Sequence, residues 1–342
     1  MNKYKVGIVG CGNIFPMHAI SVSSLDNAEI AAVCDIKEDR AKEKAKQFNC
    51  IYYLDYKEMM DKEKLDVIHI CMPHYLHAPV AVYAANKGIN ILTEKPMSIE
   101  LKDAEAMIEA AKENKVILGV IFQNRYNPGS QLIKKSLSSG MLGKIISGKL
   151  FVTWNRSDEY YSKSDWKGTW NKEGGGVIID QAIHTMDLMR WFVDSEIEYV
   201  DASISNRAHE IIEVEDSAEG VIKYKNGVVT GFYAINYYGY DAPVEIELYC
   251  ENGIAKMLAD KASVKLKDGR EFIADNNPEE VFSYGNGSKG YWGVSHVKQI
   301  KNFYAALEKE AKLDITAEEA LKTQRMICAI YESGKEKKRV KF

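Results

Sequence analysis

The first candidate for a reactive residue in this sequence is a lysine between a glutamate and a proline. The tripeptide Glu94-Lys95-Pro96 directly follows the apolar, strand-like run Asn90–Thr93. A lysine amine that is partly out of water can exchange a proton with a hydroxyl group, which makes it a candidate acid or base. We predict that Lys95 is a catalytic residue.

A second group of reactive side chains lies in the latter half of the chain. Three glycines at 174–176 precede a helix-like stretch that carries Asp180 and His184. A spacing of four places both side chains on one helix face, where a carboxylate can orient an imidazole for proton relay, although an ordinary i,i+4 hydrogen bond is a structural alternative. We predict that Asp180 and His184 are catalytic, and the residues leave open whether Lys95 or His184 is the base.

A glycine turn near the start of the chain indicates a dinucleotide. A strand-like run leads into Gly10 and Gly12, and Asn13 and Ile14 then open a helix-like stretch. The first glycine permits a tight turn, and the second lets backbone N–H groups approach a pyrophosphate at the positive end of the helix. A phenylalanine, Phe15, replaces the third glycine of this pattern, which implies a local adjustment in helix packing.

An acidic residue beyond this turn indicates which nicotinamide cofactor binds. Asp35 ends the second strand-like run, Glu29–Cys34, at about the expected distance of 20 residues from the glycines. A carboxylate there can bond both adenosine ribose hydroxyls and repels a 2′-phosphate, although it could instead cap the next helix. We predict NAD as the cofactor, with NADP disfavoured but left open by the nearby Lys37 and Arg40.

Two further loops follow strands of the same expected sheet. One carries His74 and His77, and the other carries Glu94 and Lys95. In an open α/β sheet, ligands bind beyond the carboxyl ends of the strands, so both loops are expected to line the nicotinamide half of the cofactor. The predicted cofactor contacts in these loops and at the following domain crossing are Met72, Pro73, His74, His77, Glu94, Lys95 and Gln123.

An aromatic and polar stretch leads into the second glycine turn. The CH faces of a sugar stack on aromatic rings while its hydroxyls bond polar side chains, so this stretch is a candidate substrate wall, with core or oligomer contacts as the alternative. The predicted substrate-binding residues are Lys95, Arg125, Trp154, Arg156, Tyr161, Trp166, Asp180 and His184, and Tyr291 and His296 are further pocket candidates.

The elements that position these residues fall into two halves. Up to about residue 122, short apolar runs alternate with helical stretches, which is typical of a doubly wound parallel sheet. Beyond it, strands alternate polar and apolar residues and are separated by turns such as Lys225-Asn226-Gly227, which is typical of an antiparallel sheet. We predict an α/β chain with a Rossmann domain at 1–122 and an α+β domain at 123–342 on a large, mostly antiparallel open sheet.

Together these motifs resemble the Gfo/Idh/MocA family of NAD(P)-dependent sugar oxidoreductases. The strand-linked glycine turn, the PHYLHAP segment at 73–79, the Glu-Lys-Pro tripeptide and the GGGxxxDxxxH helix occur in the family's order and approximate spacing over nearly the whole chain. The resemblance implies that Lys95, Asp180 and His184 line the substrate pocket. It also implies that the open sheet of the second domain assembles homodimers or homotetramers.

Composition narrows the classes of partner. The net charge of -4 and the charged fraction of 27% give no basic face for nucleic acid. We find no apolar run of about 18 residues, no signal peptide and no CxxC pair among the six cysteines, so we expect a cytoplasmic protein without a membrane partner. No metal is expected, because His74 and His77 have ligand-like spacing but no identifiable further ligands.

These observations predict an NAD-dependent dehydrogenase or reductase that moves a hydride between nicotinamide and a secondary hydroxyl, or ketone, of a sugar, glycoside, inositol or nucleotide sugar. Two alternatives stay open. One is an enzyme of the same family that oxidises and re-reduces its substrate to assist glycoside cleavage or elimination, and that would copurify with NAD without net NADH formation. The other is a non-catalytic NAD- or sugar-sensing protein, against which the joint presence of Lys95, Asp180 and His184 argues.

Overall fold

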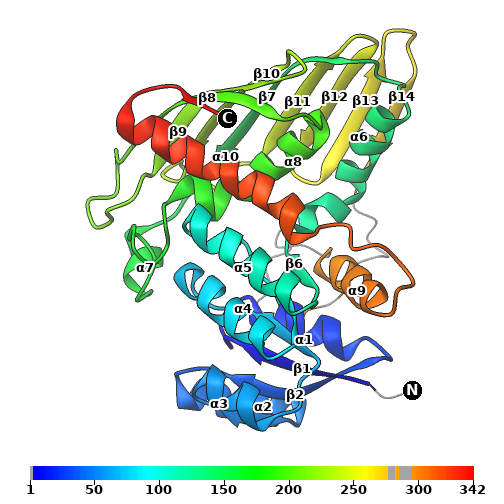
Figure 1. Ribbon diagram of the computed structural model, residues 1–342. Helices are drawn as coiled ribbons and strands as arrows, with labels where there is room; N and C mark the ends of the chain where they lie inside the picture. The colour runs from blue at the N-terminus through cyan, green and yellow to red at the C-terminus, as the bar shows by residue number, and fades with distance from the viewer. Residues whose placement is uncertain (1–2, 276–281, 283, 285–294) are drawn as a thin grey trace. The chain divides into compact units, whose positions relative to one another are not determined.

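The computed structural model describes residues 3–275, 282, 284 and 295–342 (Figure 1). The chain divides into two compact units, one of residues 1–123 with 281–321 and one of residues 124–280 with 322–342. The first crossing lies one residue from the boundary that we expected at 122. The expected limits assigned every residue after 122 to the second domain, whereas residues 281–321 belong to the first unit.

The first unit is built on a six-stranded sheet in which all neighbouring strands run parallel, in the order β3-β2-β1-β4-β5-β6. This confirms the predicted doubly wound parallel sheet, and the short strand β3 is an addition to the expected ones. The strands are β1 (Tyr4–Val9), β2 (Ala28–Cys34), β3 (Ile51–Tyr53), β4 (Val67–Ile70), β5 (Asn90–Thr93) and β6 (Leu118–Val120).

Helices of the first unit pack on this sheet and include one from the C-terminal part of the chain. They are α1 (Phe15–Ser23), α2 (Glu38–Phe48), α3 (Tyr56–Lys62), α4 (His77–Asn86), α5 (Leu101–Glu113) and α9 (His296–Leu307). Gln299 anchors α9 to the sheet, because its side chain accepts the Phe122 N–H at 3.0 Å and donates to the Val120 carbonyl at 2.7 Å. Phe15 is fully buried and meets the Phe48 ring edge-on at 5.6 Å, so the large residue at the third glycine position fills the core.

The second unit is built on a nine-stranded sheet in the order β14-β13-β12-β11-β7-β10-β9-β8-β15. Only the pair β7 and β10 runs parallel among its neighbours, which confirms the predicted mostly antiparallel sheet. The strands are β7 (Ile145–Thr153), β8 (Ile197–Ser205), β9 (Ser217–Tyr224), β10 (Val229–Ile235), β11 (Glu245–Cys250), β12 (Gly253–Leu258), β13 (Lys261–Leu266), β14 (Glu271–Ala274) and β15 (Val340–Lys341).

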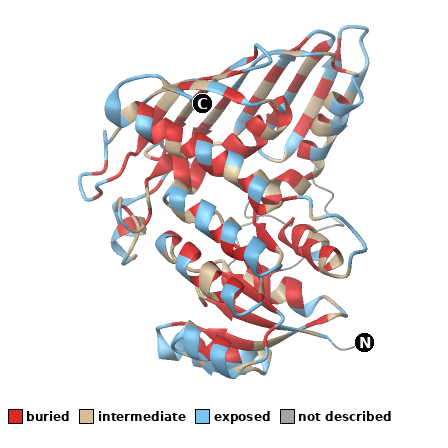
Figure 2. Ribbon diagram, viewed as in Figure 1, coloured by how far each residue is buried: buried red, intermediate tan, exposed pale blue. Residues whose placement is uncertain are grey.

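One face of the nine-stranded sheet is covered by α6 (Pro128–Ser138), α8 (Ile183–Val193) and α10 (Ala317–Glu336) (Figure 1). Burial alternates along the strands (Figure 2), as expected when only one face of a sheet lies on a core. In β9, for example, Ala218 and Ile222 are buried whereas Val221 is exposed. The other face is therefore open.

Candidate functional site

The first glycine turn depends on close backbone approach. Gly10 has a φ of +93°, and a Cβ atom there would lie 2.2 Å from the Cys71 carbonyl oxygen at the end of β4. A Cβ on Gly12 would meet nothing closer than the Arg40 guanidinium at 3.9 Å. The turn is thus tight against the sheet at Gly10 and open at Gly12, ahead of the α1 N-terminus, with Asn13 exposed. These features fit a pyrophosphate.

Asp35 is held against this turn by hydrogen bonds. Its Oδ2 accepts the Cys11 N–H at 2.9 Å, and its Oδ1 accepts the Lys37 N–H at 2.9 Å. The Arg40 Nη1 atom lies 3.4 Å from Oδ2. Helix α2 begins at Glu38 with Lys37 as its N-cap residue, so Asp35 does not cap it. The carboxylate is instead fixed beside the glycine turn, where a ribose is expected.

His77 joins the two loops that follow β4 and β5. Its ring nitrogens lie 2.7 Å from the Pro96 carbonyl oxygen and 2.8 Å from the Met72 carbonyl oxygen. The side chain is fully buried, and the His74 ring is 5.9 Å away. Contacts within the protein therefore engage the His77 side chain, while the loop backbones that it joins, including Pro73, remain candidates for cofactor contact.

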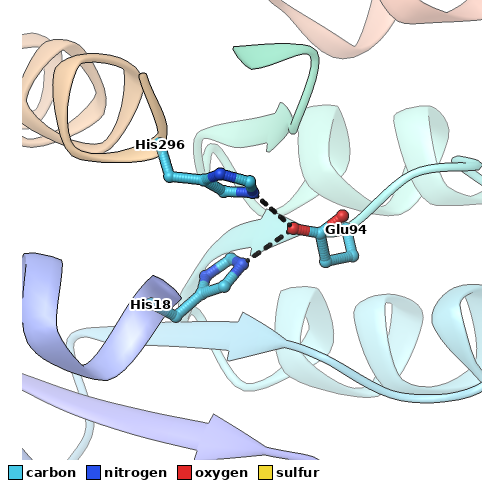
Figure 3. Close-up of side chains that lie close together, drawn as sticks. All are labelled: His18, Glu94 and His296. Atoms are coloured by element: carbon cyan, nitrogen blue, oxygen red, sulfur yellow. Dashed lines mark hydrogen bonds and ion pairs between the residues drawn. The ribbon is translucent and has the colours of Figure 1, made fainter. Parts of the chain in front are cut away.

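Glu94 is fixed by two imidazoles from other elements (Figure 3). Its Oε1 is 3.0 Å from Nε2 of His18 on α1 and 3.2 Å from Nε2 of His296 on α9, and its Oε2 accepts the Lys95 N–H at 3.1 Å. Burial alone would raise the pKa of Glu94, but the hydrogen bonds from His18 and His296 hold it well below its usual range. The ionised carboxylate thereby anchors the Lys95 backbone.

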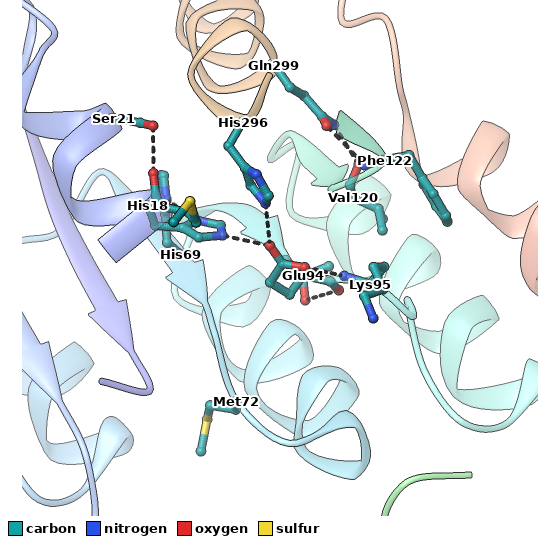
Figure 4. A network of polar contacts seen from close by, with 12 residues as sticks. His18, Ser21, His69, Met72, Glu94, Lys95, Val120, Phe122, His296 and Gln299 are labelled. Atoms are coloured by element: carbon teal, nitrogen blue, oxygen red, sulfur yellow. Dashed lines mark hydrogen bonds and ion pairs between the residues drawn. The ribbon is translucent and has the colours of Figure 1, made fainter. Parts of the chain in front are cut away.

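The contacts continue into the core as a chain of buried polar groups (Figure 4). His18 Nδ1 lies 2.9 Å from His69 Nδ1 on β4, and His69 Nε2 lies 3.1 Å from the Tyr304 hydroxyl on α9. Burial lowers the pKa of His18 and lowers that of His69 well below its usual value. Neutral imidazoles are thus favoured behind a single anionic carboxylate.

His18, Glu94 and His296 are side chains of the types that bind metal ions. The ligand atoms of His18, Glu94 and His296 lie within 4.8 Å of one another, and sequence analysis did not identify this set. We interpret it as hydrogen-bonded, because both Nε2 atoms approach the same carboxylate oxygen at hydrogen-bond distance. His296, expected near the pocket, is buried in this network, and Tyr291 lies outside the described residues.

In the second unit, the segment that carries Asp180 differs from the expected helix. Val177–Ala182 forms a π-helical turn, and α8 continues it from Ile183, so Asp180 lies in the wider turn and the half-buried His184 near the start of α8. The expectation of one regular helix was wrong here. The physical reason is that Glu215 accepts the backbone N–H groups of Gly176 and Ile178, at 2.8 and 3.0 Å.

The glycine run makes these contacts sterically accessible. A Cβ on Gly175 would lie 2.0 Å from the Tyr331 hydroxyl, and one on Gly176 would lie 1.9 Å from the Glu215 carbonyl oxygen. The Tyr331 hydroxyl donates to Glu215 at 2.9 Å. Burial raises the pKa of Glu215 to about 7. A buried acid and a tyrosine therefore fix the start of the segment that presents Asp180.

Hydrogen-bond donors surround Asp180. The most important of them, Lys167, was not identified from the sequence. The Asp180 Oδ2 atom accepts hydrogen bonds from Lys167 Nζ at 2.5 Å, from the Tyr160 hydroxyl at 2.8 Å and from Gln181 Nε2 at 2.7 Å. The available signal was a lysine directly after Trp166 and shortly before the glycine run. A charged residue in such an aromatic stretch is a candidate for a buried ion pair.

The aromatic stretch gathers beside this carboxylate, as the substrate-wall prediction requires. Lys167 Nζ lies 4.7 Å from the Tyr160 ring centre and 4.6 Å from that of Trp166. The Arg156 guanidinium lies 5.0 Å from the Trp154 ring centre and 5.4 Å from that of Tyr160. Cation–π contacts thus link Trp154, Arg156 and Trp166 to the surroundings of Asp180.

Other predicted substrate residues contact the interior of the second unit. The Arg125 guanidinium makes two 2.7 Å hydrogen bonds to the Asp187 carboxylate, and both residues are buried. The buried Tyr161 hydroxyl accepts from Asn236 Nδ2 at 2.7 Å. These contacts favour structural roles for Arg125 and Tyr161. Gln123 is buried where the chain leaves the first unit.

The parallel sheet, the glycine turn and the placement of Asp35 define a dinucleotide-binding α/β protein. The chain belongs to the GFO/IDH/MocA family: residues 4–122 match its model described as an oxidoreductase family with an NAD-binding Rossmann fold, and residues 130–256 match its C-terminal domain. This confirms the resemblance drawn from the motifs, the oxidoreductase class and NAD as the cofactor. In the described part of the chain, no helix has the length and apolar character needed to cross a membrane.

Relatives of known name are dehydrogenases of inositols and sugars. The chain is 28% identical to a myo-inositol 2-dehydrogenase of Thermotoga maritima over 248 residues, which are 71% of this chain and 72% of that protein. Its fold matches the WlbA dehydrogenase of Bordetella pertussis in complex with NADH and UDP-GlcNAcA, with a TM-score of 0.88, 25% identity and coverage of 100% and 98% of the two chains. A levoglucosan dehydrogenase with NADH and levoglucosan has the same fold, with a TM-score of 0.88 at 22% identity and 99% coverage of both chains.

Cofactor choice is expected to depend on the Asp35 carboxylate. In Asp35→Ser, binding of NADH should weaken by about tenfold or more because charge-assisted hydrogen bonds are lost, whereas NADPH binding should strengthen because Arg40 is released to face a 2′-phosphate. Fluorescence titration of both nucleotides measures this, with the exposed Asp39→Ser as the matched control. An unchanged ratio of the two dissociation constants would show that Asp35 does not select the cofactor.

The buried imidazoles predict acid sensitivity. Burial lowers the pKa of His18, His69 and His77, so the unfolded chain takes up protons near pH 6.5 that the folded chain does not. Each imidazole should therefore lower the free energy of unfolding by about 1.4 kcal/mol per pH unit as the pH drops below about 6.5, against an opposite contribution from the raised pKa values of Glu173 and Glu215. Urea unfolding between pH 5 and 8 measures this, and His69→Gln should reduce the slope by about one proton. An identical slope in that variant contradicts the assignment.

Proposed function

We propose that the protein catalyses NAD-linked hydride transfer to or from a secondary hydroxyl, or ketone, of a sugar, glycoside, inositol or nucleotide sugar. The observation that carries this proposal is the fixed Asp180 carboxylate, three residues ahead of α8 and beside a wall of aromatic and polar side chains. Such a wall suits a polyol, whose CH groups and hydroxyls need both kinds of contact. The named inositol and levoglucosan dehydrogenases support this substrate class.

The cofactor is held by residues of the first unit. Gly10 and Gly12 leave the backbone open to a pyrophosphate, and Asp35 offers its carboxylate to a ribose. Bound NAD supplies the hydride acceptor for alcohol oxidation, and NADH supplies the donor for the reverse reaction. Residues of the chain must then move the proton of the hydroxyl group.

Three side chains share that proton transfer. In oxidation, the carbinol carbon loses a hydride and its oxygen loses a proton, which Lys95 or His184 accepts as general base. Asp180 orients this group and stabilises its charged form. Glu94 supports Lys95 through the hydrogen bond to its backbone N–H. Removal of the residue that acts as base interrupts proton transfer.

Single replacements test these roles. Lys95→Ala and His184→Ala are expected to lower kcat, the true base by about 10²- to 10⁴-fold, because general-base catalysis contributes an effect of that size. NADH formation with the best substrate gives the rates, and the exposed Lys112→Ala serves as control. If both variants keep near-normal hydride transfer, the proposed proton path is wrong.

The substrate class is tested by screening the purified protein with NAD or NADP against inositols, hexoses, glycosides and nucleotide sugars. Net NADH formation with one class supports the dehydrogenase. Copurified NAD without net NADH formation would instead indicate an enzyme that oxidises and re-reduces its substrate. Absence of any nucleotide affinity would overturn the proposal.

We also propose that the protein is cytoplasmic and assembles as a homodimer or homotetramer through the open sheet face. All six cysteines are free thiols, which supports a reducing compartment. The open face exposes apolar side chains, among them Val221 on β9, Tyr249 on β11 and Ile273 on β14. Exposed apolar surface of this kind favours self-association.

A charge on that face should disrupt the assembly. Val221→Lys is expected to shift the protein to monomers in analytical ultracentrifugation, because a lysine buried in the interface would lose its hydration. Lys42→Glu, on the exposed side of α2 in the first unit, is the control. A wild-type protein that is monomeric at all concentrations would contradict this assembly.

A further inference from the structure

Three donors converge on a single oxygen of Asp180. Lys167 Nζ, the Tyr160 hydroxyl and Gln181 Nε2 all bond Oδ2, at 2.5, 2.8 and 2.7 Å. A carboxylate oxygen has about two lone pairs, so the three donors saturate Oδ2. The three contacts fix the orientation of the Asp180 carboxylate.

The charges around Lys167 are balanced. Although burial opposes its charge, Asp180, Tyr160 and Glu173 hold the pKa of Lys167 well above its usual range. Glu173 Oε1 lies 3.5 Å from Lys167 Nζ, and burial raises the pKa of Glu173 to about 8. Near neutral pH the cluster therefore holds one cation, one anion and one protonated acid.

The loop that carries Lys167 is itself fixed. The Glu173 Oε2 atom accepts the Gly168 N–H at 2.5 Å. Gly168 has a φ of +77°, and a Cβ there would lie 2.8 Å from a methyl group of Ile212. Because the Lys167 ammonium also lies beside the Tyr160 and Trp166 rings, its position is determined by several independent contacts.

We propose that Lys167 is a positioning residue of the hydride-transfer site, which holds Asp180 as an oriented carboxylate in the segment that leads to His184. This inference rests on the proposed function. Protonation of Asp180 would leave the buried ammonium of Lys167 without its counter-ion, which costs several kcal/mol. Asp180 is therefore not the base, and the hydroxyl proton goes to Lys95 or His184.

The cluster also sets an upper pH limit for activity. Glu173 faces Lys167, Asp180, Glu215 and the Gly168 N–H. As the pH rises through about 8, Glu173 ionises and becomes a second carboxylate that competes with Asp180 for Lys167. The kcat/KM profile should fall above that pH, and Glu173→Gln should remove the fall.

Lys167→Met removes the charge while retaining the length of the side chain. We expect kcat to fall by about 10²-fold, since misplacement of a catalytic group has an effect of that size, with an unchanged dissociation constant for NADH. The fall in activity near pH 8 should disappear. Lys167→Arg keeps the charge and should stay within about tenfold of the wild-type kcat. The exposed Lys163→Met is the matched control.

Crystal structures of the wild-type protein and of Lys167→Met provide a test that does not depend on turnover. We expect the Asp180 carboxylate to rotate in the variant, so that Oδ2 leaves the Tyr160 hydroxyl. An unrotated carboxylate, or a wild-type kcat and pH profile in Lys167→Met, would overturn the role of Lys167. If the wild-type protein transfers no hydride to any polyol, the proposed function fails, and the rotation alone decides whether Lys167 positions Asp180.

Discussion

Each of the two units has a carboxylate, Glu94 or Asp180, that is largely out of water and whose charge is stabilised by converging donors. Removing an ion from water costs several kcal/mol unless hydrogen bonds and opposite charges compensate. Glu94 has two imidazoles and the Lys95 N–H as partners, and Asp180 has an ammonium, a phenol and an amide. Each carboxylate is thus ionised and oriented, and each belongs to a segment that carries a candidate base, Lys95 or His184.

Burial shifts the pKa values of different kinds of group in the two units. In the first unit burial lowers the pKa of imidazoles such as His69, so protons are kept out. In the second unit burial raises the pKa of Glu173 to about 8 and that of Glu215 to about 7, so protons are retained. A folded carboxyl with a raised pKa loses stability relative to the unfolded chain as the pH rises from about 4.5. Acid therefore destabilises the first unit, whereas the raised carboxyl pKa values disfavour the second unit as the pH rises from about 4.5 to about 8.

Local patterns were enough to predict the sheets and the cofactor turn. Gly10, Gly12 and Asp35 follow the strands β1 and β2, and their residue types and spacing are the pattern of a dinucleotide turn. The contacts around the proposed catalytic residues were not predictable in this way. Glu94 meets His18 and His296 across separations of 76 and 202 residues, and no periodicity in a single sequence signals such a pair.

The helix at Asp180 shows the same limit at shorter range. The sequence predicted a regular helix, but a π turn forms where Glu215 and Tyr331 bond its first N–H groups from distant segments. Lys167 is only 13 residues from Asp180, yet its role depends on how the intervening loop folds back. Residue type predicts that a buried lysine needs an anion, but it does not identify which anion.

The central claim is hydride transfer between a polyol carbon and the nicotinamide. It is tested most directly by incubating the protein with NAD and inositols or sugars deuterated at the carbinol carbons, under single-turnover conditions, and analysing the nucleotide by mass spectrometry. The account predicts deuterium in the nicotinamide ring with at least one substrate. Nucleotide that stays unlabelled with every polyol, although it is bound by the protein, would contradict it.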